Sequence, residues 1–124
     1  MDKSTALDRY LSAILILSER YYCVRAVDVA HYLSCSKAAV SVSLKHLMRE
    51  ELVHPDEAGA LTLTTAGADR ARRYKEKCAY FTDLLLKAGV EPSQAAPEGE
   101  ALCRAVGDDT YQALKAYFEN PVAS

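Results

Sequence analysis

The segment VDVAHYLSCSKAAVSVSLKHL, residues 27–47, constrains the fold of this chain more than any other. It contains two helical patterns separated by Ser-Cys-Ser, and Ser36 is a suitable cap for the second. In the second pattern Val40, Leu44 and Leu47 recur at positions i, i+4 and i+7, so they share one helix face. The segment therefore predicts a short helix, a tight turn and a second helix that buries one face and exposes a polar one.

The rest of the chain predicts a hairpin and further helices around this motif. Two short β-prone pieces flank PDEAGA, whose Pro and Gly favour a loop longer than the tightest turns. The expected fold class is mainly α, a winged helix-turn-helix with a two-stranded wing followed by a C-terminal helical region. The predicted elements are helices over 7–20, 27–33, 36–47 and 64–89, a hairpin over 51–64, a turn-rich link or an irregular helix start over 90–100, and short helices over 100–106 and 108–118.

Charge is distributed unevenly along the chain. Residues 1–75 carry 11 Lys and Arg against 9 Asp and Glu, a net of +2, and residues 76–124 carry 4 against 8, a net of −4. A mildly basic first part and an acidic second part suit a protein that meets a polyanion with one part only.

The apolar runs and the start of the chain indicate its compartment. The longest apolar run, AILIL at 13–17, is far shorter than the roughly 18 residues of a membrane span. The first residues lack the layout of a signal peptide, and the cysteines form no Cys-x-x-Cys pair. We therefore expect a cytoplasmic protein that has no membrane partner.

A helix that stands out from the protein body can enter the major groove of DNA, which is about 12 Å wide. The predicted partner is a double-stranded DNA operator, and the basic run at 69–75 adds to the positive charge of this part. A winged-helix module that binds protein and not DNA is the alternative, since a fold alone does not determine function. No nucleophile–base pair or phosphate-binding loop points to an enzyme. The candidate DNA-binding residues are Ser36, Lys37, Ala38, Ser41, Val42 and Lys45.

Several segments resemble the DtxR/MntR family of metal-dependent transcriptional repressors. They are RYLSAILILSE, VRAVDVAHYLSCSKAAVSVSLKHLMREELV, LTLTTAGADRA, LLLKAGV and GDDTYQALKAYF, which follow one another in a single register. The resemblance implies a DNA-binding winged helix-turn-helix over 1–75 and a helical dimerisation and effector region over 76–124. It also implies a homodimeric repressor of the short form, without the SH3-like domain of longer members.

The same resemblance shows where this chain departs from the family. Arg9 and Ser12 stand at two positions where the family has metal ligands, and Cys78 stands where it has His. Glu51 replaces a usual glycine, and Val42 replaces a usual base-reading Gln. A manganese site built from hard oxygen ligands is therefore not expected.

The ligand positions that keep donor atoms are Cys78, Glu100 and Cys103, whereas Arg104 stands where the family has a His ligand. Glu100 and Cys103 are three residues apart and share a helix face, which the family fold turns toward Cys78. Two thiolates and a carboxylate suit zinc, ferrous iron or an iron–sulfur cluster. Two alternatives stay open: the cysteines are packed core residues without a metal, or they form a redox pair.

The second part of the chain is rich in apolar residues for its short helices, which predicts a homodimer through about residues 80–118. The residues expected to supply this surface are Tyr80, Leu84, Leu102, Val106, Tyr111, Leu114 and Phe118.

Overall fold

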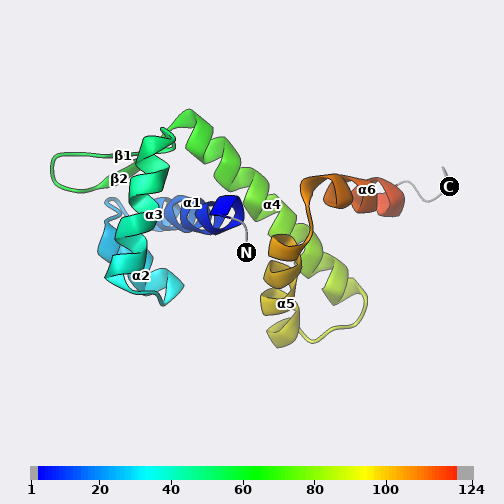
Figure 1. Cartoon of the computed structure of the whole chain (residues 1–124). Helices are drawn as coiled ribbons and strands as arrows, with labels where there is room; N and C mark the ends of the chain where they lie inside the picture. Colours follow the sequence, from blue (N-terminus) through cyan, green and yellow to red (C-terminus); the bar gives the residue numbers. More distant parts are fainter. Residues whose placement is uncertain (1–2, 120–124) are drawn as a thin grey trace. The chain divides into compact units, whose positions relative to one another are not determined.

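The computed structural model describes residues 3–119, with side chains described from Ala6 onward. It is mainly helical and carries a two-stranded antiparallel hairpin, so the predicted fold class is confirmed (Figure 1). Within these residues, no helix combines the length and apolar character needed to cross a membrane. The elements are α1 (Lys3–Arg20), α2 (Ala26–Leu33), α3 (Lys37–Arg49), β1 (Val53–Pro55), β2 (Leu61–Leu63), α4 (Thr65–Lys87), α5 (Pro92–Ala105) and α6 (Asp108–Glu119).

Of the two alternatives predicted for 90–100, a turn-rich link or an irregular helix start, the structure shows the helix, because α5 already begins at Pro92. Proline suits the first helical position, where the missing N–H would have no partner in any case. Pro97 also lies inside the helix, five residues after Pro92. It lacks the N–H that would bond to the carbonyl of Ser93, and the helix nevertheless continues through it to Ala105.

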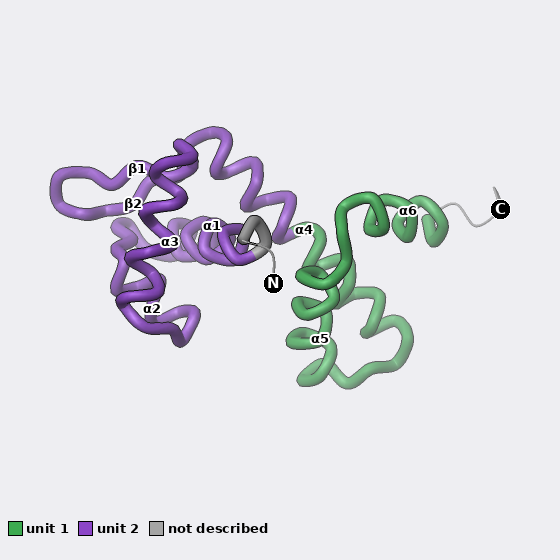
Figure 2. The backbone as a smooth tube through the Cα atoms, viewed as in Figure 1, with its two compact units in different colours: residues 1, 76–124 green, residues 2–75 purple. Residues whose placement is uncertain are grey.

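The chain divides into two compact units, residues 2–75 and residues 76–124 (Figure 2). The long helix α4 begins in the first unit and ends in the second. The fold does not test the roles predicted for these two parts, DNA binding and dimerisation, so both stay predictions.

One hydrophobic core holds the first unit together, and every element of that unit contributes to it. The inward face predicted for α3 is confirmed, because Val40, Leu44 and Leu47 are all buried. Burying each such side chain stabilises a fold by about 1.5–3 kcal/mol. The side chains with no exposed surface are Leu11, Ile14, Val29, Val40, Leu47, Val53 and Ala71.

The hairpin forms the wing, and its loop is organised by one aspartate. Asp56 Oδ1 accepts hydrogen bonds from the N–H groups of Ala58 and Ala60, both at 2.8 Å. Arg25, just before α2, donates from Nη1 to the carbonyl of Ala58 at 2.7 Å and so anchors the loop. The paired residues of the two strands are Val53 with Leu63, His54 with Thr62, and Pro55 with Leu61.

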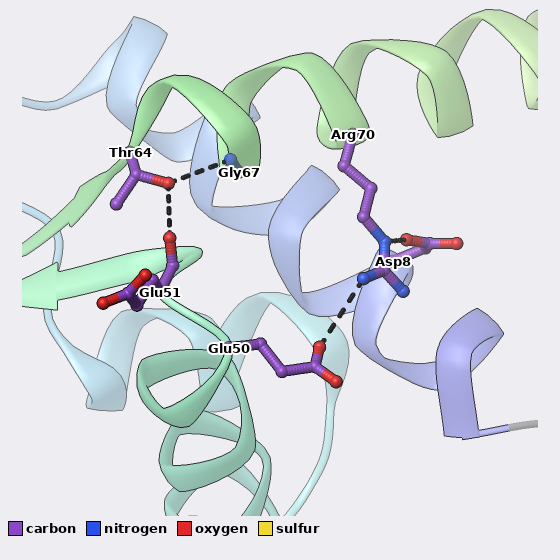
Figure 3. Close-up of polar contacts among 6 residues, drawn as sticks. All are labelled: Asp8, Glu50, Glu51, Thr64, Gly67 and Arg70. Carbon is purple, nitrogen blue, oxygen red and sulfur yellow. Dashed lines mark hydrogen bonds and ion pairs between the residues drawn. The ribbon is translucent and has the colours of Figure 1, made fainter.

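The junction between α3, the wing and α4 is held by polar contacts (Figure 3). The Thr64 hydroxyl donates to the carbonyl of Glu51 at 2.8 Å and accepts from the N–H of Gly67 at 3.0 Å, so it caps α4. A Cβ at Gly67 would collide with the carbonyl oxygen of Leu52, so only glycine allows this approach. Glu51 itself has φ 58°, the left-handed conformation that glycine adopts most easily.

In the second unit, α4 and α5 cross at a glycine. A Cβ at Gly99 would lie 2.8 Å from the Cα of Thr82, closer than packed side chains tolerate. Cys78 precedes Thr82 by four residues and Cys103 follows Gly99 by four, so each cysteine lies about one helical turn from the crossing.

Helix α6 is attached to α4 through a lysine and an aromatic cluster. Lys77 donates from Nζ to the carbonyl of Val106 and lies 3.5 Å from Asp108 Oδ1. The Tyr111 ring packs edge-on against Tyr80, with 5.4 Å between the ring centroids, and its centroid lies 5.9 Å from Lys77 Nζ. The long Lys77 stem is therefore buried while its ammonium joins the end of α5 to the start of α6.

The conformation of Glu51 leads to a stability prediction. Replacing Glu51 by Gly should raise the free energy of unfolding by about 1 kcal/mol, because glycine adopts a left-handed conformation without steric cost. Urea denaturation monitored by circular dichroism measures the change. Glu51→Ala is the control: it removes the same side chain but keeps a Cβ, so it should give no such gain. Equal stabilisation by both substitutions would contradict the conformational explanation.

Candidate nucleic-acid interface

The turn between α2 and α3 is built by three consecutive polar residues. Ser34 has φ 53° and ends α2 in the left-handed conformation. The N–H of Cys35 then donates back to the carbonyl of Ala30 at 3.0 Å. Ser36 Oγ accepts a hydrogen bond from the N–H of Ala39 at 3.1 Å, which confirms its predicted role as the N-cap of α3.

The six residues predicted to contact DNA are all exposed: Ser36 caps α3, and the other five lie on the helix between and beside its buried residues. We call this set the exposed α3 face. Val42 is 56% exposed near its centre, although valine is usually buried. The face thus combines two lysines with small polar and apolar groups. Its residues are Ser36, Lys37, Ala38, Ser41, Val42 and Lys45.

One basic residue near this face was missed by the sequence analysis. Arg49 is exposed and lies four residues after Lys45, so it shares the same side of the helix one turn further along. The spacing of the two residues was the signal that would have identified it.

The wing carries charge of both signs at its tip. Asp56 and Glu57 are exposed there, and the guanidinium of Arg25 bonds to the neighbouring Ala58 carbonyl. One carboxylate oxygen of Asp56 holds the turn, so this negative charge is fixed at the wing tip. The wing tip is therefore not a basic surface, in contrast to α3.

The basic run at 69–75 is largely engaged within the first unit. Arg70 faces inward, with Nε 2.6 Å from Asp8 Oδ1 and Nη1 3.7 Å from Glu50 Oε2 (Figure 3). Lys75 Nζ lies 3.7 Å from Glu19 Oε2. These pairs join α4 to α1 and α3, so the run contributes less positive charge to the surface than its sequence indicates.

The second unit brings Cys78 and Cys103 together but gives Glu100 another partner. Cys103 is 1% exposed, Cys78 is half-buried, and their side chains are hydrogen-bonded. The hydrogen bond with Cys78 raises the pKa of the Cys103 thiol most, and burial raises it further. The charges of Cys78 and Glu100 act in the same direction, whereas the charge of Lys77 lowers this pKa. Glu100 Oε1 instead lies 2.9 Å from Arg104 Nη1.

The comparisons with known proteins support the fold. No protein-family profile matches the chain, and no curated protein matches it by sequence. Among solved structures, the manganese regulator SloR matches at 27% identity with a TM-score of 0.78 and covers 91% of this chain. IdeR from T. acidophilum (20% identity, TM-score 0.72, 90% of this chain) and ScaR with bound Zn²⁺ (22%, 0.71, 91%) share the fold. The chain spans 53% of the length of each of the three.

The residues at the predicted metal positions do not fit the metals named for those proteins. Manganese prefers oxygen ligands, whereas two of the three candidates are thiols. Zinc in proteins takes at least three protein ligands, and among residues 3–119 no three His, Cys, Asp or Glu side chains are grouped to hold an ion. A soft metal or iron–sulfur cluster at Cys78, Glu100 and Cys103 stays a prediction that would require Glu100 to leave Arg104.

The inward position of Arg70 predicts its effect on stability. Arg70→Ala should lower the free energy of unfolding by about 1–2 kcal/mol, because two carboxylates lose a partly buried, charged partner. Arg72→Ala is the matched control: Arg72 is 59% exposed and pairs only with its helix neighbour Asp69 among the ion pairs described, so it should change stability by less than about 0.5 kcal/mol. Equal losses in urea denaturation would show that Arg70 does not clip the helices together.

Proposed function

We propose that the chain is a DNA-binding transcription regulator that reads the major groove with the exposed α3 face. The observation that carries the proposal is the division of α3 into a buried face, which fixes its rotation, and an opposite face with two exposed lysines. A short helix, a tight turn and a projecting helix form the arrangement that places side chains against base edges.

The chemistry of the exposed α3 face suits this role. Lys37 and Lys45 supply positive charge for phosphates, and the hydroxyls of Ser36 and Ser41 can donate to phosphate oxygens. Val42, at the centre, offers an apolar surface to a thymine methyl group. Small side chains at the start of the helix allow the DNA backbone to approach closely.

Fold and sequence resemblance support a regulator over other winged-helix proteins. The manganese regulator SloR shares the fold across 91% of this chain. The DtxR/MntR resemblance further favours a repressor that acts without catalysing a reaction. Regulation by manganese does not enter this proposal, because two of the three candidate ligands, Cys78 and Cys103, are thiols.

The regulator is proposed to act as a homodimer through the second unit. Two copies present two α3 helices to half-sites about 34–36 Å apart on DNA. Phe118 is 52% exposed, and Tyr117 and Leu86, which the sequence analysis did not select, are 56% and 41% exposed. Tyr111 was expected at this surface but is buried within its own unit. The other expected residues, which are half-buried, are Tyr80, Leu84, Leu102, Val106 and Leu114.

A second candidate function, a protein-binding winged helix, is favoured by exposed side chains elsewhere in the first unit. Tyr22 is fully exposed, and Tyr21, Val27 and Tyr32 are 59%, 51% and 42% exposed. Large apolar side chains in water are common at protein interfaces. Measurement of DNA affinity separates the two candidate functions, since a protein-binding winged helix needs no affinity for DNA.

The two lysines of the exposed α3 face should control salt-dependent DNA binding. Lys37→Ala combined with Lys45→Ala should weaken binding and reduce the slope of log K against log salt by about one unit for each phosphate that the variant no longer neutralises. The measurement is fluorescence anisotropy with a labelled duplex of mixed sequence, titrated at several salt concentrations.

The control for this experiment removes the same charge from α4. Lys75→Ala combined with Lys87→Ala deletes two exposed lysines that pair with Glu19 and Asp83. The control variant should keep the wild-type slope. Identical slopes for wild type and both variants would remove the exposed α3 face from the interface, and an absence of binding by the wild type would favour the protein-binding candidate.

The dimer proposal is tested by sedimentation velocity at micromolar concentration. The wild type should sediment as a dimer, and Tyr117→Ser combined with Phe118→Ser should shift it toward the monomer, because the dimer would then bury less apolar surface. Tyr21→Ser combined with Tyr22→Ser removes comparably exposed aromatic rings from the first unit and should leave the dimer intact. A monomeric wild type would refute the proposal.

A further inference from the structure

A close helix crossing in the second unit lies beside two cysteines. At Gly99 the absence of a side chain lets α5 come against the backbone of Thr82 in α4. Cys103 on α5 and Cys78 on α4 lie one turn away from this point on the same side of the crossing, and their side chains are hydrogen-bonded. A helix pair held this closely brings the two thiol side chains near each other.

The two sulfurs are unequally accessible. Cys103 is 1% exposed, whereas Cys78 is half-buried and keeps part of its surface in solvent. Neither cysteine forms a disulfide in the structure. The carboxylate nearest in sequence, Glu100, is paired with Arg104. Two adjacent thiols with unequal access are the arrangement in which one reacts first and the other completes a disulfide.

We infer that Cys78 and Cys103 form a reversible intramolecular disulfide when the chain meets a peroxide, which links α4 to α5. This modification site is independent of the proposed DNA-binding role, since it lies in the second unit and depends only on the two thiols. A reversible pair also suits a reducing compartment, where disulfides are transient and serve redox chemistry.

The reaction balances with hydrogen peroxide as the oxidant. The Cys78 sulfur attacks one peroxide oxygen, the O–O bond breaks, and one water leaves, which produces a sulfenic acid at Cys78. The Cys103 sulfur then attacks the Cys78 sulfur and loses its proton, the S–O bond breaks, and a second water leaves. The two sulfurs together lose two electrons and two protons, and the peroxide is reduced to two waters. A thiol such as dithiothreitol reverses the step by exchange.

The remaining cysteines serve as internal controls. Cys23 is exposed, so a peroxide can reach it directly, and Cys35 accepts a hydrogen bond from the Tyr10 hydroxyl at 3.8 Å. Trypsin separates all four cysteines: Cys23 lies in peptide 21–25, Cys35 in 26–37, Cys78 in 78–87 and Cys103 in 88–104. A disulfide can therefore be assigned from peptide masses alone.

The test uses the folded full chain, reduced and then treated with hydrogen peroxide. After alkylation in denaturant and digestion, peptides 78–87 and 88–104 should appear linked, at a mass about 2 Da below their sum. The protein should run as a single chain on a non-reducing gel, and dithiothreitol should restore both peptides. The inference is overturned if peptides 78–87 and 88–104 are recovered alkylated and unlinked while peptide 21–25 is oxidised.

Single substitutions test the order of events. In Cys103→Ser, Cys78 can no longer form the disulfide and should be oxidised further, with a mass gain of about 32 Da as the sulfinic acid. In Cys78→Ser, the buried Cys103 should stay reduced. Cys35→Ser should still form the link. Formation of the link to the same extent in protein unfolded with urea would show that chance proximity, not the α4–α5 crossing, brings the thiols together.

Discussion

Burial of one face of α3 is the constraint on which the rest of the first unit depends. Val40 and Leu47 have no exposed surface and Leu44 is 7% exposed, so α3 cannot rotate without bringing apolar groups into water. The helix must then direct its lysines outward, and the turn before it must be short enough for α2 to support it. The exposed α3 face is thus a consequence of the core, since the same packing that folds the unit also positions its candidate interface.

Electrostatics divides the basic residues into two groups. Lys37, Lys45 and Arg49 stand in solvent, where their charges can meet a polyanion. Arg70 and Lys75 are instead paired with acidic residues of other helices. These pairs hold the first part of α4 against α1 within the first unit, but they withdraw positive charge from the surface. Counting the basic residues of a segment therefore overestimates the positive charge that a binding partner can reach.

The second unit depends on a close approach between two helices. Because Gly99 permits α5 to contact the backbone of Thr82, Cys78 and Cys103 are brought within hydrogen-bonding reach of each other. On α5, close to Cys103 in sequence, Arg104 forms an ion pair with the carboxylate of Glu100. An ion pair and a thiol pair thus stand at the positions where the resemblance implied metal ligands, and this donor set favours sulfur chemistry over manganese binding.

The sequence by itself determined the order and type of the elements, the buried face of α3 and the serine cap, because helical periodicity and capping depend on neighbouring residues. It also identified Glu51 as a residue standing where glycine is usual, although only the structure showed its positive φ. The sequence left residues 90–100 open between a link and a helix start, and the structure decided for the helix. The inward position of Arg70 was decided by the tertiary structure as well. So were the pairing of Cys78 with Cys103 and the capture of Glu100 by Arg104. Such interactions depend on which partners the packing of helices brings within reach, and residue spacing alone does not specify this.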